Sequence, residues 1–127
     1  MIYGIGTDIV KIARIHDSLE RFGERFACRL LTDAEWAEYR LSRQPERFLA
    51  KRFAAKEAVV KALGVGFREG LAFNQIGVIH DSRGKPELVY RGQALAHTRA
   101  AGITQSLLSL ADERDYAVAF VILLGTQ

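Results

Sequence analysis

The sequence has little cysteine, little proline and no long apolar run. One cysteine in 127 residues, Cys28, excludes an internal disulfide and a cysteine-based zinc site, and it fits a reducing compartment. Two prolines and 49% hydrophobic residues do not suit a disordered chain. The longest apolar stretch, 116–124, is far shorter than the roughly 20 residues that cross a bilayer. Since the first residues also lack a signal-peptide pattern, we expect a cytoplasmic protein without a membrane partner, folded as one domain over 1–127.

The charge is small overall but unevenly distributed. Lys and Arg exceed Asp and Glu by 18 to 15, yet the segment from Arg40 to Glu69 holds eight basic residues against Glu46, Glu57 and Glu69. Such a segment predicts an anionic partner, which could be nucleic acid, a phosphorylated small molecule or an acidic protein. Taken singly, a solvated helix face is the default interpretation for each of these basic residues, and only their concentration favours an anionic partner. A core of this size is modest, so self-association would help to stabilise it.

Periodicity predicts an α+β fold, in which a mainly antiparallel sheet packs against a long central helix and shorter helices. The long helix should begin at Pro45 and end at Leu63, before Gly64. A second helix should begin at the capping box Thr32-Asp33-Ala34-Glu35. We expect further helices from apolar spacing over 12–22 and at 93–101, and strands at 2–10, 76–80, 87–91, 104–110 and 116–124.

Glu57 stands out on the long helix because it falls at the border of the apolar stripe, close to Phe53 and Val60. Glutamate is rarely buried without a partner. One interpretation is an ordinary ion pair with Lys61, one turn later, worth roughly 0.2 to 0.5 kcal/mol. The other is that Glu57 faces a cleft and holds a hard cation, with Lys61 beside it to bind an anionic substrate.

Asp8 is the natural second carboxylate for such a cation. It follows Gly4 and Gly6 on one face of the first strand, and glycines leave that face bare for a close approach. The alternative is that Asp8 caps the helix that begins near Lys11. The third glycine of a dinucleotide-binding motif is absent, so the two glycines do not indicate one.

Two segments resemble the signatures of a known family. They are Gly4-Ile5-Gly6-Thr7-Asp8-Ile9-Val10 and the stretch Arg52-Phe53-Ala54-Ala55-Lys56-Glu57-Ala58-Val59-Val60-Lys61-Ala62-Leu63-Gly64. Their order and separation are similar to those of the holo-acyl-carrier-protein synthases, the small type of 4'-phosphopantetheinyl transferase. The resemblance implies transfer of 4'-phosphopantetheine from coenzyme A to a serine of apo acyl carrier protein, with adenosine 3',5'-bisphosphate as the second product.

The resemblance also implies roles for residues of this chain. Asp8 and Glu57 would bind Mg²⁺, and Asp8, Glu57 and Lys61 would form the catalytic group. Coenzyme A contacts would come from Arg52, Phe53, Lys56, Lys61 and Gly64. The resemblance further implies a homotrimer with sites between subunits. The basic segment, with Arg14 and Arg21, would dock the acidic carrier protein.

Three points stay open in the sequence. Asp112 occupies a position where many family members carry a histidine that contacts coenzyme A phosphate, and an ionised aspartate cannot donate to phosphate, so Arg114 is a possible replacement. The proton acceptor could be Glu57 or, as second candidate, Glu35. The alternative functions are a basic, non-catalytic RNA-binding domain and a purely structural subunit, but neither explains the positions of Asp8 and Glu57.

Overall fold

The computed structural model describes residues 1–68 and 70–126, and it has the predicted α+β architecture. A three-stranded antiparallel sheet has the order β1-β5-β4, with β1 at Ile2–Lys11, β4 at Ile103–Asp112 and β5 at Tyr116–Gly125. A separate hairpin pairs β2, Ile76–His80, with β3, Pro86–Tyr90. The predicted strands are therefore confirmed, with shifts of one or two residues at their ends.

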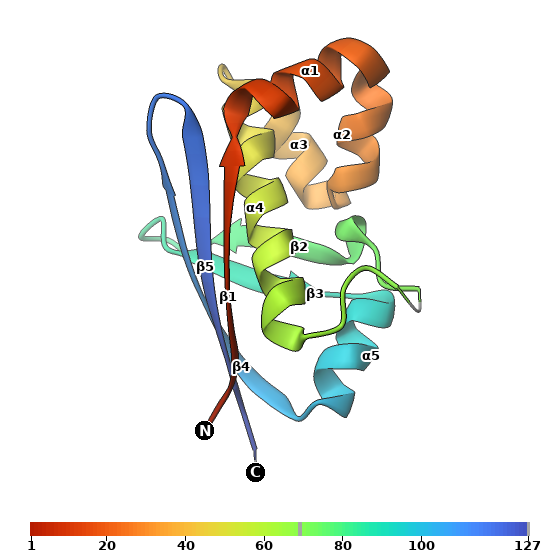
Figure 1. The fold of residues 1–127 in the computed structure, drawn as a ribbon, viewed down its shortest axis with the longest axis vertical. Helices are drawn as coiled ribbons and strands as arrows, with labels where there is room; N and C mark the ends of the chain where they lie inside the picture. The colour runs from red at the N-terminus through yellow and green to blue at the C-terminus, as the bar shows by residue number, and fades with distance from the viewer. Residues whose placement is uncertain (69, 127) are drawn as a thin grey trace.

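The long helix α4, Pro45–Leu63, lies between the three-stranded sheet and the remaining elements (Figure 1). It begins with Pro45 in its first turn and ends at Gly64, whose φ of 78° is left-handed. Both boundaries were predicted. Because α4 is packed on most sides, eleven of its residues are buried, including alanines that permit close approach of neighbouring backbones.

Shorter helices cover one end of α4 (Figure 1). They are α1, Ile12–Phe22; α2, Glu24–Leu30; and α3, Asp33–Leu41, while α5, Gly92–Ala100, lies beside a single 3-10 turn, η1, at Phe73–Gln75. The predicted capping box forms at the start of α3. Helix α2 was missed, because it has only seven residues and follows α1 after Gly23, which takes a φ of 65°.

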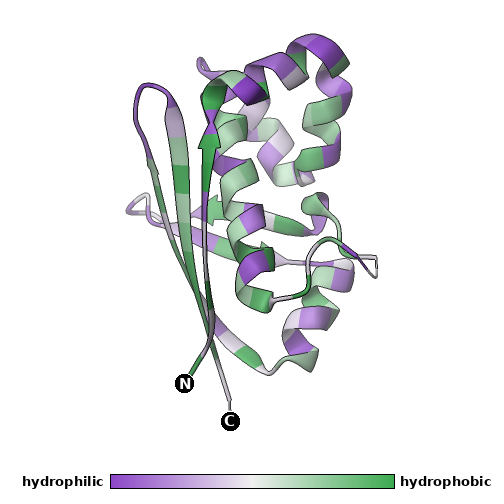
Figure 2. Cartoon of the chain, in the orientation of Figure 1, coloured by the Kyte–Doolittle hydropathy of each residue, from purple (hydrophilic) through white to green (hydrophobic). Residues whose placement is uncertain are grey.

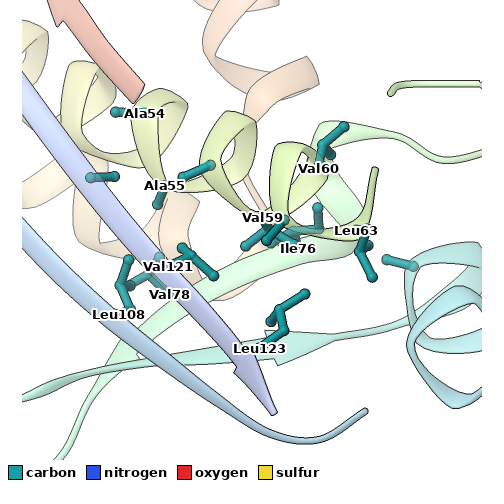
Figure 3. Packing of buried hydrophobic residues seen from close by; sticks show 14 of the residues in the cluster. Ala54, Ala55, Val59, Val60, Leu63, Ile76, Val78, Leu108, Val121 and Leu123 are labelled. Carbon is teal, nitrogen blue, oxygen red and sulfur yellow. The ribbon is translucent and has the colours of Figure 1, made fainter. Parts of the chain in front are cut away.

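The hydrophobic core divides into two clusters along α4. One joins α4 to the two sheets through residues such as Val59, Ile76 and Leu123, all fully buried (Figure 3). The other joins α4 to α1 and α2 through Ile15, Leu30 and Leu49. Hydrophilic bands interrupt the otherwise apolar α4 (Figure 2). None of the helices described over 1–68 and 70–126 is long and apolar enough to span a membrane.

Candidate active site

Two glycines let β1 lie directly against α4. A Cβ atom on Gly6 would overlap the carbonyl oxygen of Ala58, and one on Gly4 would overlap that of Ala62. The predicted close approach beside Asp8 is therefore the approach of α4 itself. Because side chains alternate along a strand, Asp8 is the next residue after Gly6 on this face of β1.

Lys61 of α4 pairs with Asp8. Its Nζ donates to Oδ1 of Asp8 at 2.9 Å and to the carbonyl oxygen of Thr7 at 3.1 Å. The side chain of Lys61 is 52% exposed and that of Asp8 only 14%. The interpretation of Asp8 as a helix cap is wrong, because α1 has Lys11 at its N-cap and no side chain caps it.

Glu57 lies in the same region but has no salt bridge within 4 Å in the described part of the chain. The interpretation as an i to i+4 pair with Lys61 is therefore wrong, since Lys61 binds Asp8 instead. Burial raises the pKa of the Glu57 carboxyl above its ordinary value, and the negative charge of Asp8 raises it further, while Lys61 opposes both. The protein thus holds two carboxylates close together, and a partly exposed lysine is bonded to one of them, Asp8.

A cavity of about 240 Å³ opens beside these groups. Its polar lining includes Asp8, Arg14 and Glu57, and its apolar lining includes Phe26 and Phe53. Of the predicted site residues, Asp8, Glu57 and Phe53 therefore come together here, with Lys61 bonded to Asp8. Arg14 was predicted only as part of a docking surface, yet it also lines this cavity, as does Ser18 one turn later on α1. Nothing in the sequence indicated that this face of α1 would meet the cavity.

Lys56 lies on a different side of α4 and is fully buried. Its Nζ donates to Oε1 of Glu35 at 2.6 Å and to the carbonyl oxygens of Leu30 and Phe73 at 2.5 and 3.2 Å. Burial lowers the pKa of Lys56 to about 8, although the charge of Glu35 opposes that effect. This position contradicts the predicted coenzyme A contact of Lys56, because all three of its donors are used inside the protein.

Glu35 forms the predicted capping box and is completely buried. Its Oε1 also accepts from Lys56, and its Oε2 accepts from the backbone N–H of Val78 at 2.9 Å. It lines neither the cavity beside Asp8 nor any solvent-exposed surface. Glu35 is therefore corrected from a second candidate proton acceptor to a structural residue.

Arg52 is also buried, one turn before Lys56. Its guanidinium lies 4.3 Å above the ring of Phe48, and its Nε is 3.5 Å from Glu35 but has no hydrogen-bond partner among the described residues. Burial lowers the pKa of Arg52. Arg52 lines a second cavity, of about 290 Å³, together with Lys51 and His80, and that cavity shares no lining residue with the cavity beside Asp8.

The last predicted contact, Gly64, lies at one end of α4, and a network that was not predicted lies near the other end. Gly64 is the left-handed residue that ends the helix, and its N–H donates to the carbonyl oxygen of Val60. Near the other end, Arg47 donates to Asp112 at 2.8 Å and Lys51 lies 3.4 Å from it. Burial alone would raise the pKa of Asp112, but the bond from Arg47 and the charge of Lys51 outweigh it and hold the pKa low. Their sequence separation of more than 60 residues gave no signal of this network.

Comparisons with known proteins identify the family of this chain. The family model described as 4'-phosphopantetheinyl transferase superfamily matches residues 4–121. The holo-acyl-carrier-protein synthase of Nitrosospira multiformis is 54% identical over 123 residues, covering 97% of this chain and 98% of that protein. The crystal structure of the Neisseria meningitidis synthase is 48% identical, with a TM-score of 0.91, over 98% of this chain and 99% of that chain.

A further solved structure carries a bound ligand. The Helicobacter pylori holo-acyl-carrier-protein synthase in complex with coenzyme A is 30% identical, with a TM-score of 0.82, over 94% of this chain and 99% of that chain. The matches extend over nearly the whole length of both partners, so they include β1 with Asp8 and α4 with Glu57. The chain belongs to the 4'-phosphopantetheinyl transferase superfamily, and within it to the holo-acyl-carrier-protein synthases.

Proposed function

We propose that this chain, acting as one domain over residues 1–127, transfers the 4'-phosphopantetheine group of coenzyme A to a serine of apo acyl carrier protein. The observation that carries the proposal is that Asp8 and Glu57 line one cavity, with Lys61 bonded to Asp8, in a chain of this family. In the reaction the serine oxygen bonds to the β-phosphorus, the bond from that phosphorus to the bridging oxygen breaks, and adenosine 3',5'-bisphosphate leaves.

Asp8 and Glu57 are the proposed ligands of Mg²⁺, and their surroundings fit that ion. The described residues include no group of three or more metal-ligating side chains, but Mg²⁺ commonly uses one or two carboxylates together with phosphate oxygens and water. Among the described residues Glu57 has no salt-bridge partner, and burial, together with the charge of Asp8, raises the pKa of its carboxyl. A cation bound between the two carboxylates would oppose both effects. When bound, Mg²⁺ would offset the negative charge that develops on the leaving phosphate.

Lys61 and Glu57 have distinct proposed roles. The ammonium of Lys61 is half exposed on a flexible stem, so it can donate to a pyrophosphate oxygen as well as to Asp8. Glu57 is the proposed acceptor of the serine proton, because, among the described residues, no lysine or arginine forms a salt bridge with this carboxylate of the cavity. The proton then resides on the Glu57 carboxyl until solvent removes it.

We also propose that the active form is a homotrimer whose sites lie between subunits. Arg52 and the pair Asp8 and Glu57 line separate cavities, so one coenzyme A would reach both sets most simply from two copies. The outer face of the three-stranded sheet supports self-association, because Ile5, Ile9 and Phe120 are 60%, 63% and 41% exposed. Exposed apolar patches of this kind mark protein interfaces.

The proposed contacts of coenzyme A are Arg52, Phe53, Lys61 and Gly64. Arg52 is supported by its place in the lining of a cavity, Phe53 and Lys61 by their places next to Glu57, and Gly64 by a helix end one turn from Lys61. The acidic carrier protein would dock on α1, where Arg14 borders the cavity and Arg21 lies one or two turns further along. We place the reaction in the cytoplasm, as the single cysteine suggests.

Mass spectrometry tests the proposal directly. Apo acyl carrier protein is incubated with coenzyme A, Mg²⁺ and this protein, and its intact mass is measured with and without a chelator. We expect the carrier to gain one phosphopantetheine group, and we expect the chelator to abolish the gain. No gain, accompanied by salt-sensitive binding of RNA, would instead favour the non-catalytic RNA-binding alternative.

A further inference from the structure

The ammonium of Lys56 connects three elements to α4 at one buried point. Its acceptors are the carbonyl oxygen of Leu30 at the end of α2, the carboxylate of Glu35 in α3 and the carbonyl oxygen of Phe73 at the start of η1. An ammonium has three donors, so none is left for a ligand. The side chain of Lys56 is fully buried, as is that of Glu35.

Two of these three acceptors carry the apolar wall of the cavity beside Glu57. Helix α2, held through Leu30, contributes Phe26 to that wall. The turn η1, held through Phe73, supports Phe53, since the centroids of the two rings are 5.5 Å apart. Phe67 stacks on the other side of Phe73 at 3.9 Å. Lys56 therefore holds the aromatic residues next to Glu57, Phe26 and Phe53, although it lies on a different side of α4 from Glu57.

The ion pair gives geometry rather than a large net stability. Both oxygens of Glu35 are bonded, Oε1 to Lys56 and the N–H of Thr32 and Oε2 to the N–H of Val78. Buried, satisfied pairs are often no more stabilising than neutral replacements of similar volume, because desolvation offsets the attraction. What a neutral replacement cannot reproduce is a donor that reaches Leu30 and Phe73 at once.

We infer that Lys56 is a positioning residue for transfer: it fixes α2 and η1 against α4, sets the aromatic wall of the cavity beside Glu57, and touches no substrate. The inference deepens the proposed function and rests on it. Its consequence is that loss of the Lys56 ammonium weakens the binding of coenzyme A even when the fold is stable. The chemical groups at Asp8, Glu57 and Lys61 stay in place, so the chemical step is affected much less.

Two variants separate this role from a purely structural one. Lys56→Met leaves Glu35 buried without its partner, so it should destabilise the protein. A loss of activity in this single variant would follow from instability as well as from a displaced cavity wall, so it does not separate the two roles. The double variant Glu35→Gln with Lys56→Met removes both charges and should recover most of the stability. We expect that the double variant still has a KM for coenzyme A, and a Kd measured by calorimetry, about tenfold above wild type, with kcat reduced less than threefold.

A third variant and a control complete the design. Glu35 also lies 3.5 Å from Arg52, a proposed coenzyme A contact, so the double variant could raise KM through Arg52. Phe73→Leu leaves Glu35, Lys56 and Arg52 intact and should still raise KM, which excludes that route and keeps the inference testable if the double variant folds poorly. Leu123→Ala lies in the other core cluster and should lose stability without any change in KM. Wild-type KM in the stable double variant, or in Phe73→Leu, would overturn the positioning role. If wild type itself transfers nothing, the proposed function fails first, and the two failures remain distinguishable.

Discussion

The two sides of α4 carry the same kinds of side chain in opposite situations. On one side Lys56 and Glu35 are buried, and the polar atoms of both have hydrogen-bond partners. On the other side Glu57 has no cation within 4 Å, in the part of the chain that the structure describes, and Asp8 shares a half-exposed lysine. Fully bonded groups can only hold the fold together, whereas an unsatisfied carboxylate beside a cavity keeps its capacity to bind a cation or accept a proton.

Glu57→Gln has the largest expected effect. It tests the side of α4 that carries Asp8 and Glu57, which we call the open side. The amide keeps the size of the side chain but loses the negative charge and the proton acceptor, so transfer should fall roughly 1000-fold or more. The free energy of unfolding should change little, because Glu57 forms no salt bridge with any residue that the structure describes. The measurement is steady-state transfer with saturating Mg²⁺, beside chemical denaturation.

Glu87→Gln on the exposed face of β3 is the matched control for this experiment, and its transfer rate should equal that of wild type. Near-normal turnover of Glu57→Gln would remove Glu57 from the reaction. A loss of folding in the same variant would show that the open side is structural after all, which would end the distinction between the two sides.

Glu35→Gln makes the complementary change on the other side of α4, where Lys56 and Glu35 are buried and which we call the sealed side. It leaves the charge of Lys56 buried without a counter-charge, and breaking a buried pair in this way costs about 3 kcal/mol or more. We expect a clear drop in the midpoint of urea unfolding, while the variant that remains folded still carries Asp8, Glu57 and Lys61 at the open side. A stability equal to that of wild type would contradict the assignment of Glu35 and Lys56 to the structural side.

The sequence could predict elements whose signals are local. Pro45 and Gly64 mark the two ends of α4 because each acts on the backbone at its own position. The capping box of α3 is equally local, since it joins Thr32 and Glu35 three residues apart. Helix α2 lacks such a signal, and it forms because Ala27 and Leu30 pack into the core next to α4.

The site was predicted in part, and the errors share a physical cause. Periodicity placed Glu57 beside the apolar stripe and alternation placed Asp8 on the glycine face, and both carboxylates do line one cavity. Spacing alone could not show that Lys61 reaches across to Asp8, 53 residues away, in place of its neighbour on the helix. Nor could it show that Lys56 is sealed by Leu30 and Phe73, which depends on the packing of distant elements.

Gly6→Ala sharpens the comparison by acting on the backbone of the open side. The added Cβ would overlap the carbonyl oxygen of Ala58, so β1 must move away from α4. We expect a loss of about 2 kcal/mol in the free energy of unfolding and a larger relative loss of transfer, since Asp8 moves with the strand. Thr7→Ser, one residue later on the opposite face, keeps the bond to the Ala119 carbonyl and should alter neither quantity. Unchanged activity in Gly6→Ala would mean that Asp8 needs no close approach of β1 to α4.

His16 and Glu46 extend the comparison to an acid and a base at the surface, with side chains 46% and 42% exposed, where the smallest effect is expected. His16 Nδ1 lies 2.7 Å from Glu46 Oε1, and this hydrogen bond, together with the charge of Glu46, raises the pKa of His16 above 6.5. A raised pKa in the folded state means that the pair stabilises the protein fully below pH 6.5, and that the stabilisation disappears as the pH rises through the folded-state pKa.

Wild type should therefore be slightly more stable than His16→Gln at pH 5.5 and equal to it at pH 8.5, as measured by chemical denaturation, and added salt should shrink the difference. Glu46→Gln should show the same loss, because it removes the charge that raises the pKa of His16. A difference that persists unchanged at pH 8.5 would show that His16 acts through packing, and that a solvent-exposed pair behaves like neither side of α4.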